Sequence, residues 1–259
     1  IVHFSHLSPD DALQMVGNYH SSYLVPALLV SFSDLLSGLI LPHLSHDWEV
    51  GRREEAARRL NMTIRLSVLG MIAFGACLLG FGPLLFDVVL QGRYNDGLAV
   101  LPWTLAACVW YGAHLLSQNY LWCAEKSRLA IAPLALGLVV NIGLNVLLLP
   151  TFGLYGAVLA TATGTCLCVL ATLGTNRLQG MAIDKGTWLM ALAPIALGLG
   201  FWPAVVALTA LAATTLATDL IVTSSDRCEL KDMALDLASR KLGRGPLGRA
   251  NHHGTTATS

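Results

Sequence analysis

The 259 residues are 54% hydrophobic and only 12% charged, and their formal net charge is zero. The mean hydropathy is +0.61. An ordinary soluble domain carries about 25% charged residues, so the composition excludes that class. The sequence contains no Asp-rich prenyl-diphosphate site, Gly-rich phosphate loop or zinc motif. We therefore expect a membrane protein that is not an enzyme and has no cofactor, no metal and no nucleic-acid partner.

Apolar runs long enough to cross a bilayer recur along the chain. A hydrocarbon core about 30 Å thick needs roughly 20 mostly apolar residues in a helix. Candidate spans occur at 13–42, 62–90, 98–123, 129–149, 153–174, 187–201 and 203–223. The sixth is short, and Phe201-Trp202-Pro203 separates it from the seventh, which predicts a tight hairpin. The expected fold is an all-α integral membrane protein, a polytopic bundle of about seven transmembrane helices.

The basic residues alternate between the two ends of these spans. The connections at 43–65, 124–128 and 175–187, with the tail from 224, hold every Lys and Arg except Arg93. Cytoplasmic connections carry an excess of Lys and Arg, so these segments are predicted to be cytoplasmic. The N-terminal end is then outside, the C-terminus is cytoplasmic, and the protein is a multi-pass component of the cell membrane.

The two ends of the chain are expected to differ from the bundle. The first residue is Ile1, and 1–11 resembles the outer end of a truncated helix with an extracytoplasmic loop. We expect the chain to be the C-terminal portion of a longer transporter, with a transmembrane lobe at 12–223. A cytoplasmic amphipathic helix is predicted at 224–242, since its apolar residues share one face. The Gly-, Thr- and Ser-rich tail at 243–259 is expected to be disordered.

Small and polar residues repeat every four positions around Pro150. Asn141 and Asn145 share a helix face with Gly137. After the turn at Pro150-Thr151-Phe152-Gly153, a second face carries Gly156, Ala160, Gly164 and Cys168. Small residues let helix backbones approach closely in lipid. The two asparagines therefore either form hydrogen bonds between helices, which we favour, or line a polar cavity.

Several segments resemble a known family in the expected order. Residues 145–161, NVLLLPTFGLYGAVLAT, resemble a stretch of bacterial polysaccharide flippases in which a helix ends in Pro, a short turn ends in Gly, and a small-residue helix follows. Further resemblances are Val16-Gly17-Asn18-Tyr19, Leu41-Pro42-His43-Leu44-Ser45 with the charged arm after it, and Gln91-Gly92-Arg93-Tyr94. The resemblance covers about 12–175, and 186–223 would be an additional helix pair. The chain departs from the family at Thr151, where members often carry a basic residue.

The family is the multidrug/oligosaccharidyl-lipid/polysaccharide exporter superfamily. The resemblance implies the C-terminal lobe of a MATE-like, two-lobed transporter whose central cavity moves a polyprenyl-linked oligosaccharide outward for cell-surface polysaccharide biosynthesis. Its implied partners are this lipid-linked substrate, membrane lipid and the missing N-terminal lobe of the same transporter. The alternatives are a cation-coupled multidrug antiporter of the same superfamily and a non-transporting membrane component of a polysaccharide assembly complex.

Polar groups inside the spans are the candidate cavity residues. A charge at the bilayer centre costs about 2.5–3.5 kcal/mol on insertion scales, so such groups usually face a cavity or a partner. Asp34 either faces the cavity or is hydrated and hydrogen-bonded by neighbouring serines. His114, with Gln118 on its face, either couples protons or packs through a hydrogen bond. Together with Asn141 and Asn145, these residues and Arg65 form the predicted transport site.

Arginines gather at the entrance to the second span. Arg52, Arg53, Arg58 and Arg59 precede Arg65, which is deeper in the apolar run. A pyrophosphate head group is bound well by guanidinium groups. The i, i+4 spacing of Glu54 and Glu55 with Arg58 and Arg59 instead favours an ordinary solvated helix for the first four. We therefore expect Arg65 to be the better site candidate.

Overall fold

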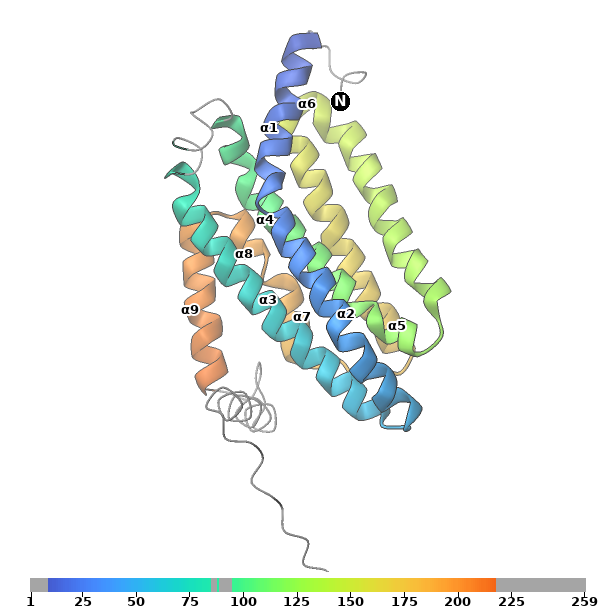
Figure 1. Ribbon diagram of the computed structural model, residues 1–259. Coiled ribbons are helices and arrows are strands. Elements are labelled where there is room, and N and C mark those ends of the chain that lie inside the picture. The colour runs from blue at the N-terminus through green and yellow to red at the C-terminus, as the bar shows by residue number, and fades with distance from the viewer. Residues whose placement is uncertain (1–8, 85–87, 89–94, 218–259) are drawn as a thin grey trace, which may run out of the picture. The chain divides into compact units, whose positions relative to one another are not determined.

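The computed structural model describes residues 9–84, 88 and 95–217. Within these ranges every regular element is a helix, and the prediction of an all-α protein is confirmed (Figure 1). The predicted amphipathic helix at 224–242, the tail at 243–259 and the motif at 91–94 fall outside the described ranges.

The first predicted span, 13–42, is divided by a proline. Helix α1 covers Pro9–Leu24 and α2 covers Ala27–Glu49. Pro26 has no amide N–H and cannot continue the helical hydrogen-bond ladder. The amides of Leu28 and Leu29 instead bond three residues back, to the carbonyls of Val25 and Pro26. The prediction of one continuous helix over 13–42 is therefore wrong at this point, and α2 also runs seven residues beyond the predicted end at 42.

The next two spans form the centre of the bundle. Helix α3 covers Arg53–Leu84 and begins directly after a turn at Gly51, whose φ is +82°. Helices α4, Asn95–Ser117, and α5, Asn119–Cys123, follow each other with a break at Gln118. Among the candidate membrane spans, 97–123 is the most enclosed, with 67% of its most apolar window buried against 22% for α2. Its core side chains include Leu105, Val109 and Leu116.

Helix α6, Ser127–Leu178, consists of two helices that meet at Gly153. Gly153 has φ +55° and ψ −130°, a conformation available to glycine and strongly disfavoured for other residues. The second half runs back beside the first (Figure 1). The predicted turn at Pro150-Thr151-Phe152-Gly153 is thus confirmed.

The C-terminal part of the bundle is more broken than predicted. Helix α7 covers Lys185–Leu192, α8 covers Ile195–Gly198, and α9 covers Phe201–Ala217. Pro194 interrupts the predicted sixth span, 187–201, for the same reason as Pro26. The chain turns at Gly200, φ +111°, whereas Phe201-Trp202-Pro203 begins α9 and does not form the predicted separation.

Large apolar side chains are exposed on the outer faces of α2 and α6. Examples are Leu28 and Leu35 on α2 and Val139 and Leu147 on α6, each 60–68% exposed. In the described part of the chain, four helices are long and apolar enough to cross a membrane, and the longest of them is the kinked α6. The shorter apolar helix Phe201–Thr214 adds to them. Membrane lipid is the solvent that suits such faces, as the composition predicted.

Candidate functional site

Asn141 and Asn145 form a short polar chain between the two halves of α6. The Asn141 amide nitrogen donates to the Thr161 hydroxyl at 3.2 Å. Asn145 donates to the Asn141 side-chain oxygen at 2.8 Å and to its backbone carbonyl at 2.9 Å. Thr161 in turn donates to the carbonyl of Ala157. Asn141 therefore makes the kind of interhelical bond expected of it, while Asn145 acts through Asn141.

Two glycines bring the halves of α6 together beside this chain. A Cβ atom placed on Gly137 would lie 2.8 Å from the Gly164 carbonyl oxygen, and one on Gly164 would lie 2.8 Å from that of Gly137. A cavity of about 210 Å³ lies against this contact and is lined by Tyr111 and Asn141, among others. Both asparagines are half-buried, so their polar groups lie at the edge of the bundle.

His114 lies inside the bundle, between α4 and the second half of α6. Its side chain is 2% exposed, and its Nδ1 lies 2.9 Å from the hydroxyl of Thr172. That hydroxyl donates its hydrogen to the carbonyl of Cys168, so Nδ1 of His114 must carry the hydrogen of this bond. This geometry matches the packing alternative. Gln118 is half-buried at the break between α4 and α5, where its backbone N–H donates to the backbone carbonyl of His114.

Arg65 is fully buried and pairs with an acidic residue that the sequence did not suggest. Its side chain is 2% exposed and lies 3.3 Å from Asp184, just before α7. One turn earlier on α3, Asn61 donates to the carbonyl of Ala182 at 2.7 Å and accepts from Thr187 at 2.8 Å. These bonds attach the connection before α7 to α3. The spacing of Asn61 and Arg65 by four residues in a helix was the available signal.

Asp34 lies on the exposed face of α2. The serines expected to hydrogen-bond it bond elsewhere, Ser31 to the carbonyl of Ala27 and Ser37 to Asn119 on α5. That part of the alternative prediction is wrong, because Ser37 lies on the buried side of the helix. Asp34 thus presents a carboxylate outward, beside the exposed Phe32 and Leu35.

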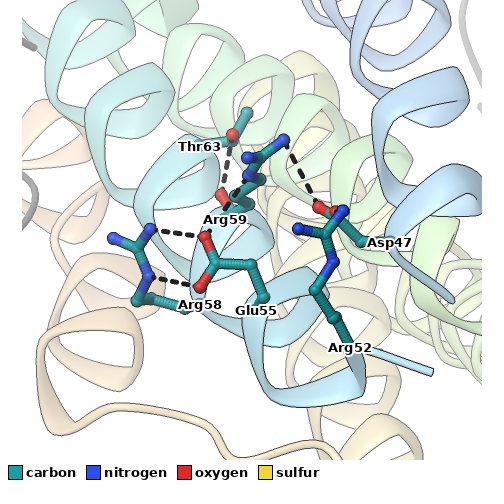
Figure 2. A network of polar contacts seen from close by, with 6 residues as sticks. All are labelled: Asp47, Arg52, Glu55, Arg58, Arg59 and Thr63. Atoms are coloured by element: carbon teal, nitrogen blue, oxygen red, sulfur yellow. Dashed lines mark hydrogen bonds and ion pairs between the residues drawn. The ribbon is translucent and has the colours of Figure 1, made fainter. Parts of the chain in front are cut away.

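Most arginines of the predicted cationic cluster are neutralised by neighbouring carboxylates (Figure 2). Asp47, only 1% exposed, lies 3.1 Å from Arg52 and 3.3 Å from Arg59. Glu55 accepts hydrogen bonds from Arg58 at 2.6 and 3.2 Å and lies 3.6 Å from Arg59. These contacts are those of an ordinary charged helix entrance. They set three of the four arginines apart from Arg53, which lies over the ring of Trp48 at 5.0 Å.

The six predicted site residues therefore fall into separate environments. Asn141 and Asn145 are joined to each other, Arg65 belongs to the attachment of α7, and His114 is packed against α6. Asp34 is exposed on α2, whereas Arg65 and His114 are buried. Whether they line one transport path stays a prediction.

Comparison with known proteins identifies the family. The model of the family described as "Lipid II flippase MurJ" matches residues 19–224, which take in all of α2 to α9. The chain belongs to the MurJ lipid II flippase family. The predicted relationship to the multidrug/oligosaccharidyl-lipid/polysaccharide exporter superfamily is confirmed at this level, and the narrower resemblance to polysaccharide flippases stays a prediction.

One curated relative is a flippase by name. The chain is 24% identical over 147 residues to the "Probable low-salt glycan biosynthesis flippase Agl15" of Haloferax volcanii, an alignment that covers 57% of this chain and 31% of the relative. The chain thus spans about a third of the length of the curated relative it matches. No solved structure matches the sequence.

Proposed function

We propose that this chain is the C-terminal part of a flippase that moves a polyprenyl-linked oligosaccharide across the cytoplasmic membrane for cell-surface polysaccharide biosynthesis. The observation that carries the proposal is the match of the MurJ family to residues 19–224. It extends over nearly the whole described bundle and does not depend on one short motif. The names of the matching family and of the relative, lipid II flippase and glycan biosynthesis flippase, favour a lipid-linked saccharide as the substrate class.

The exposed polar groups are consistent with a cavity that is completed by helices of a second lobe. Asp34 presents its charge on an outer face, where contact with hydrocarbon would cost about 2.5–3.5 kcal/mol. Substrate sites of such transporters lie near the midplane between repeats. We therefore propose that an N-terminal lobe, which the longer relative has room to contain, faces Asp34 and the Asn141–Asn145 pair across the cavity.

Arg65 and His114 have different proposed roles because they are buried. Arg65, held by Asp184, would position α7 relative to α3, and His114 would hold the second half of α6 against α4. Gln118 would lie at the hinge-like break between α4 and α5. The proposed orientation has the C-terminus in the cytoplasm, following the distribution of Lys and Arg.

Complementation tests the proposed function. The 259-residue chain alone should not restore surface polysaccharide to a flippase-deficient strain, whereas the chain together with the rest of the transporter should. Asp34→Asn in the complete transporter should abolish rescue without lowering its abundance in the membrane. No rescue by the complete transporter at normal abundance would contradict the proposal, and export of cationic drugs by it in place of rescue would favour the multidrug antiporter.

A further inference from the structure

A large cavity of the described bundle lies away from the predicted transport residues. It has a volume of about 610 Å³ and is formed where α2 and α5 end, α3 begins, and the second half of α6 ends. Its residues come from all three connections that the charge pattern predicts to be cytoplasmic. Figure 1 shows these helix ends gathered at one end of the bundle. The volume is within the range of small-molecule sites, about 300–1,000 Å³.

Two cations of this cavity have no carboxylate partner among the described residues. Arg53 contacts the ring of Trp48, and Lys126 donates to the side-chain oxygen of Gln179 at 2.7 Å. Two arginines near Arg53 in the sequence, Arg52 and Arg58, are by contrast paired with Asp47 and Glu55. The two cations are therefore available to bind an anionic group.

Two carboxylates of the same cavity likewise have no basic partner in the described part of the chain. They are Glu54 and Glu125, both exposed at its rim. A bare phosphate would be repelled by them. A ligand that carries hydroxyl groups beside its phosphate would use both sets, because carboxylates accept hydrogen bonds from hydroxyls and guanidinium and ammonium groups donate to phosphate.

The backbone at Glu125 gives independent support. Glu125 has φ +58°, the left-handed conformation that follows the end of α5 and that glycine usually supplies. The amide of the next residue, Lys126, bonds the carbonyl of Leu121, which completes this helix end. A glutamate here is conformationally unfavourable, and in native proteins such strain is concentrated at functional positions.

We propose that this cavity binds the phosphorylated saccharide head group of a lipid-linked substrate at the cytoplasmic end of the bundle. Arg53 and Lys126 bind the phosphate, and Glu54, Glu125 and Gln179 bind sugar hydroxyls. Trp48 and Tyr120, whose rings meet edge to face at 5.3 Å, form the wall. The inference rests on the proposed function for the lipid-linked nature of the ligand, and it names a docking site separate from the midplane cavity.

Binding to the full 259-residue chain in lipid nanodiscs tests this assignment. The probe is farnesyl diphosphate-linked N-acetylglucosamine, compared with farnesyl diphosphate and with free N-acetylglucosamine. The linked probe should bind about tenfold or more tightly than either part, because only it engages both sets of residues. Equal binding of farnesyl diphosphate would overturn the proposal and indicate a general site for anionic lipid.

A double variant and a matched double control identify the site. Arg53→Gln with Lys126→Gln should weaken the linked probe about tenfold or more, since both donors to phosphate are lost. Arg52→Gln with Arg58→Gln removes two cations of the same segment that are already paired, and should change affinity less than about twofold. Equal losses in both pairs would show a diffuse charge effect and reject the site. If the first pair does not fold, Lys126→Gln alone, at an exposed position, should still lose affinity.

Glu125→Gly separates binding from folding. It relieves the left-handed backbone, so the thermal unfolding midpoint should rise, while loss of the carboxylate should weaken the linked probe and not farnesyl diphosphate. Unchanged affinity for the linked probe would reject the role of Glu125. Because binding is measured without transport, binding by the chain combined with no rescue by the complete transporter would contradict only the proposed function. Rescue by the complete transporter combined with no binding here would contradict only this inference.

Discussion

Threonine hydroxyls on α6 act as acceptors for polar side chains of the packed helices. Thr161 and Thr172 each donate to the carbonyl four residues earlier, at 3.0 and 2.8 Å. The hydrogen of the hydroxyl is thus used within the helix, and its lone pairs remain for Asn141 and His114. A threonine hydroxyl in a membrane helix can in this way donate a hydrogen bond to its own helix and accept one from a neighbouring side chain.

This arrangement predicts a difference between two threonines of the same helix. Thr172→Val leaves the Nδ1 hydrogen of buried His114 without an acceptor and should destabilise the protein by about 1–3 kcal/mol. Thr175→Val is the control, because Thr175 bonds the carbonyl of Ala171 on its own helix. Thermal unfolding in detergent should show a lower midpoint for Thr172→Val and little change for Thr175→Val. Equal midpoints would mean that the His114 bond does not stabilise the bundle.

The pair of Arg65 and Asp184 predicts a non-additive effect. Asp184→Asn leaves the buried guanidinium of Arg65 without its carboxylate, so the single variant should unfold at a lower temperature than the wild type. Arg65→Met with Asp184→Asn removes the buried charge as well and should recover part of the loss. A double variant that is less stable than Asp184→Asn would show that the pair does not act as a unit.

Individual polar contacts were predictable only where both partners follow a local repeat. The spacing of Gly137, Asn141 and Asn145 predicted a helix face, and the turn at Gly153 placed a small-residue helix against it. The partner of Arg65 was not predictable, because Asp184 is 119 positions away in the sequence and lies in an exposed connection. Neither periodicity nor composition specifies which connection folds back onto which helix.

At the scale of elements, close packing along the two halves of α6 depends on two glycines, Gly137 and Gly164. Gly164→Ala places a methyl group 2.8 Å from the Gly137 carbonyl oxygen, so the two halves must separate and the unfolding midpoint should fall. Gly143→Ala, on the same helix, is the matched control, since no atom lies within 4 Å of the Cβ position of Gly143. Alanine favours the helix over glycine by about 1 kcal/mol, so Gly143→Ala should be neutral or stabilising. If both variants were equally stable, close packing at Gly137 and Gly164 would not hold the hairpin.

Helix existence was predictable and helix continuity was not. Hydropathy located every long apolar helix, since each must cover about the same thickness of hydrocarbon. The breaks at Pro26 and Pro194 lie within apolar runs, where hydropathy is insensitive to the loss of a single backbone hydrogen bond. Prolines at 42, 83, 102 and 133 stay inside helices, so proline alone does not mark a break.

At the scale of the whole molecule, the distribution of charge predicts which end of the bundle faces the cytoplasm. In a cysteine-free background, Thr151→Cys in the turn of α6 should react with an impermeant maleimide from outside intact cells. Val50→Cys, 58% exposed at the end of α2, should react only after the membrane is opened. Both positions are exposed, so solvent access alone does not distinguish them. Labelling of both from the same side would contradict the predicted topology.

Translocation of a lipid-linked saccharide in reconstituted vesicles tests whether this chain belongs to a lipid-linked saccharide flippase. The complete transporter of which this chain is proposed to be a part is placed in vesicles with a fluorescent farnesyl diphosphate-linked N-acetylglucosamine. Transfer of this probe between leaflets is followed with an impermeant quencher. Transfer should be well above that in protein-free vesicles, and Asp34→Asn should lose this transfer at equal incorporation. Transfer no faster than in protein-free vesicles, for a folded and correctly inserted transporter, would contradict the assignment of this chain to a lipid-linked saccharide flippase.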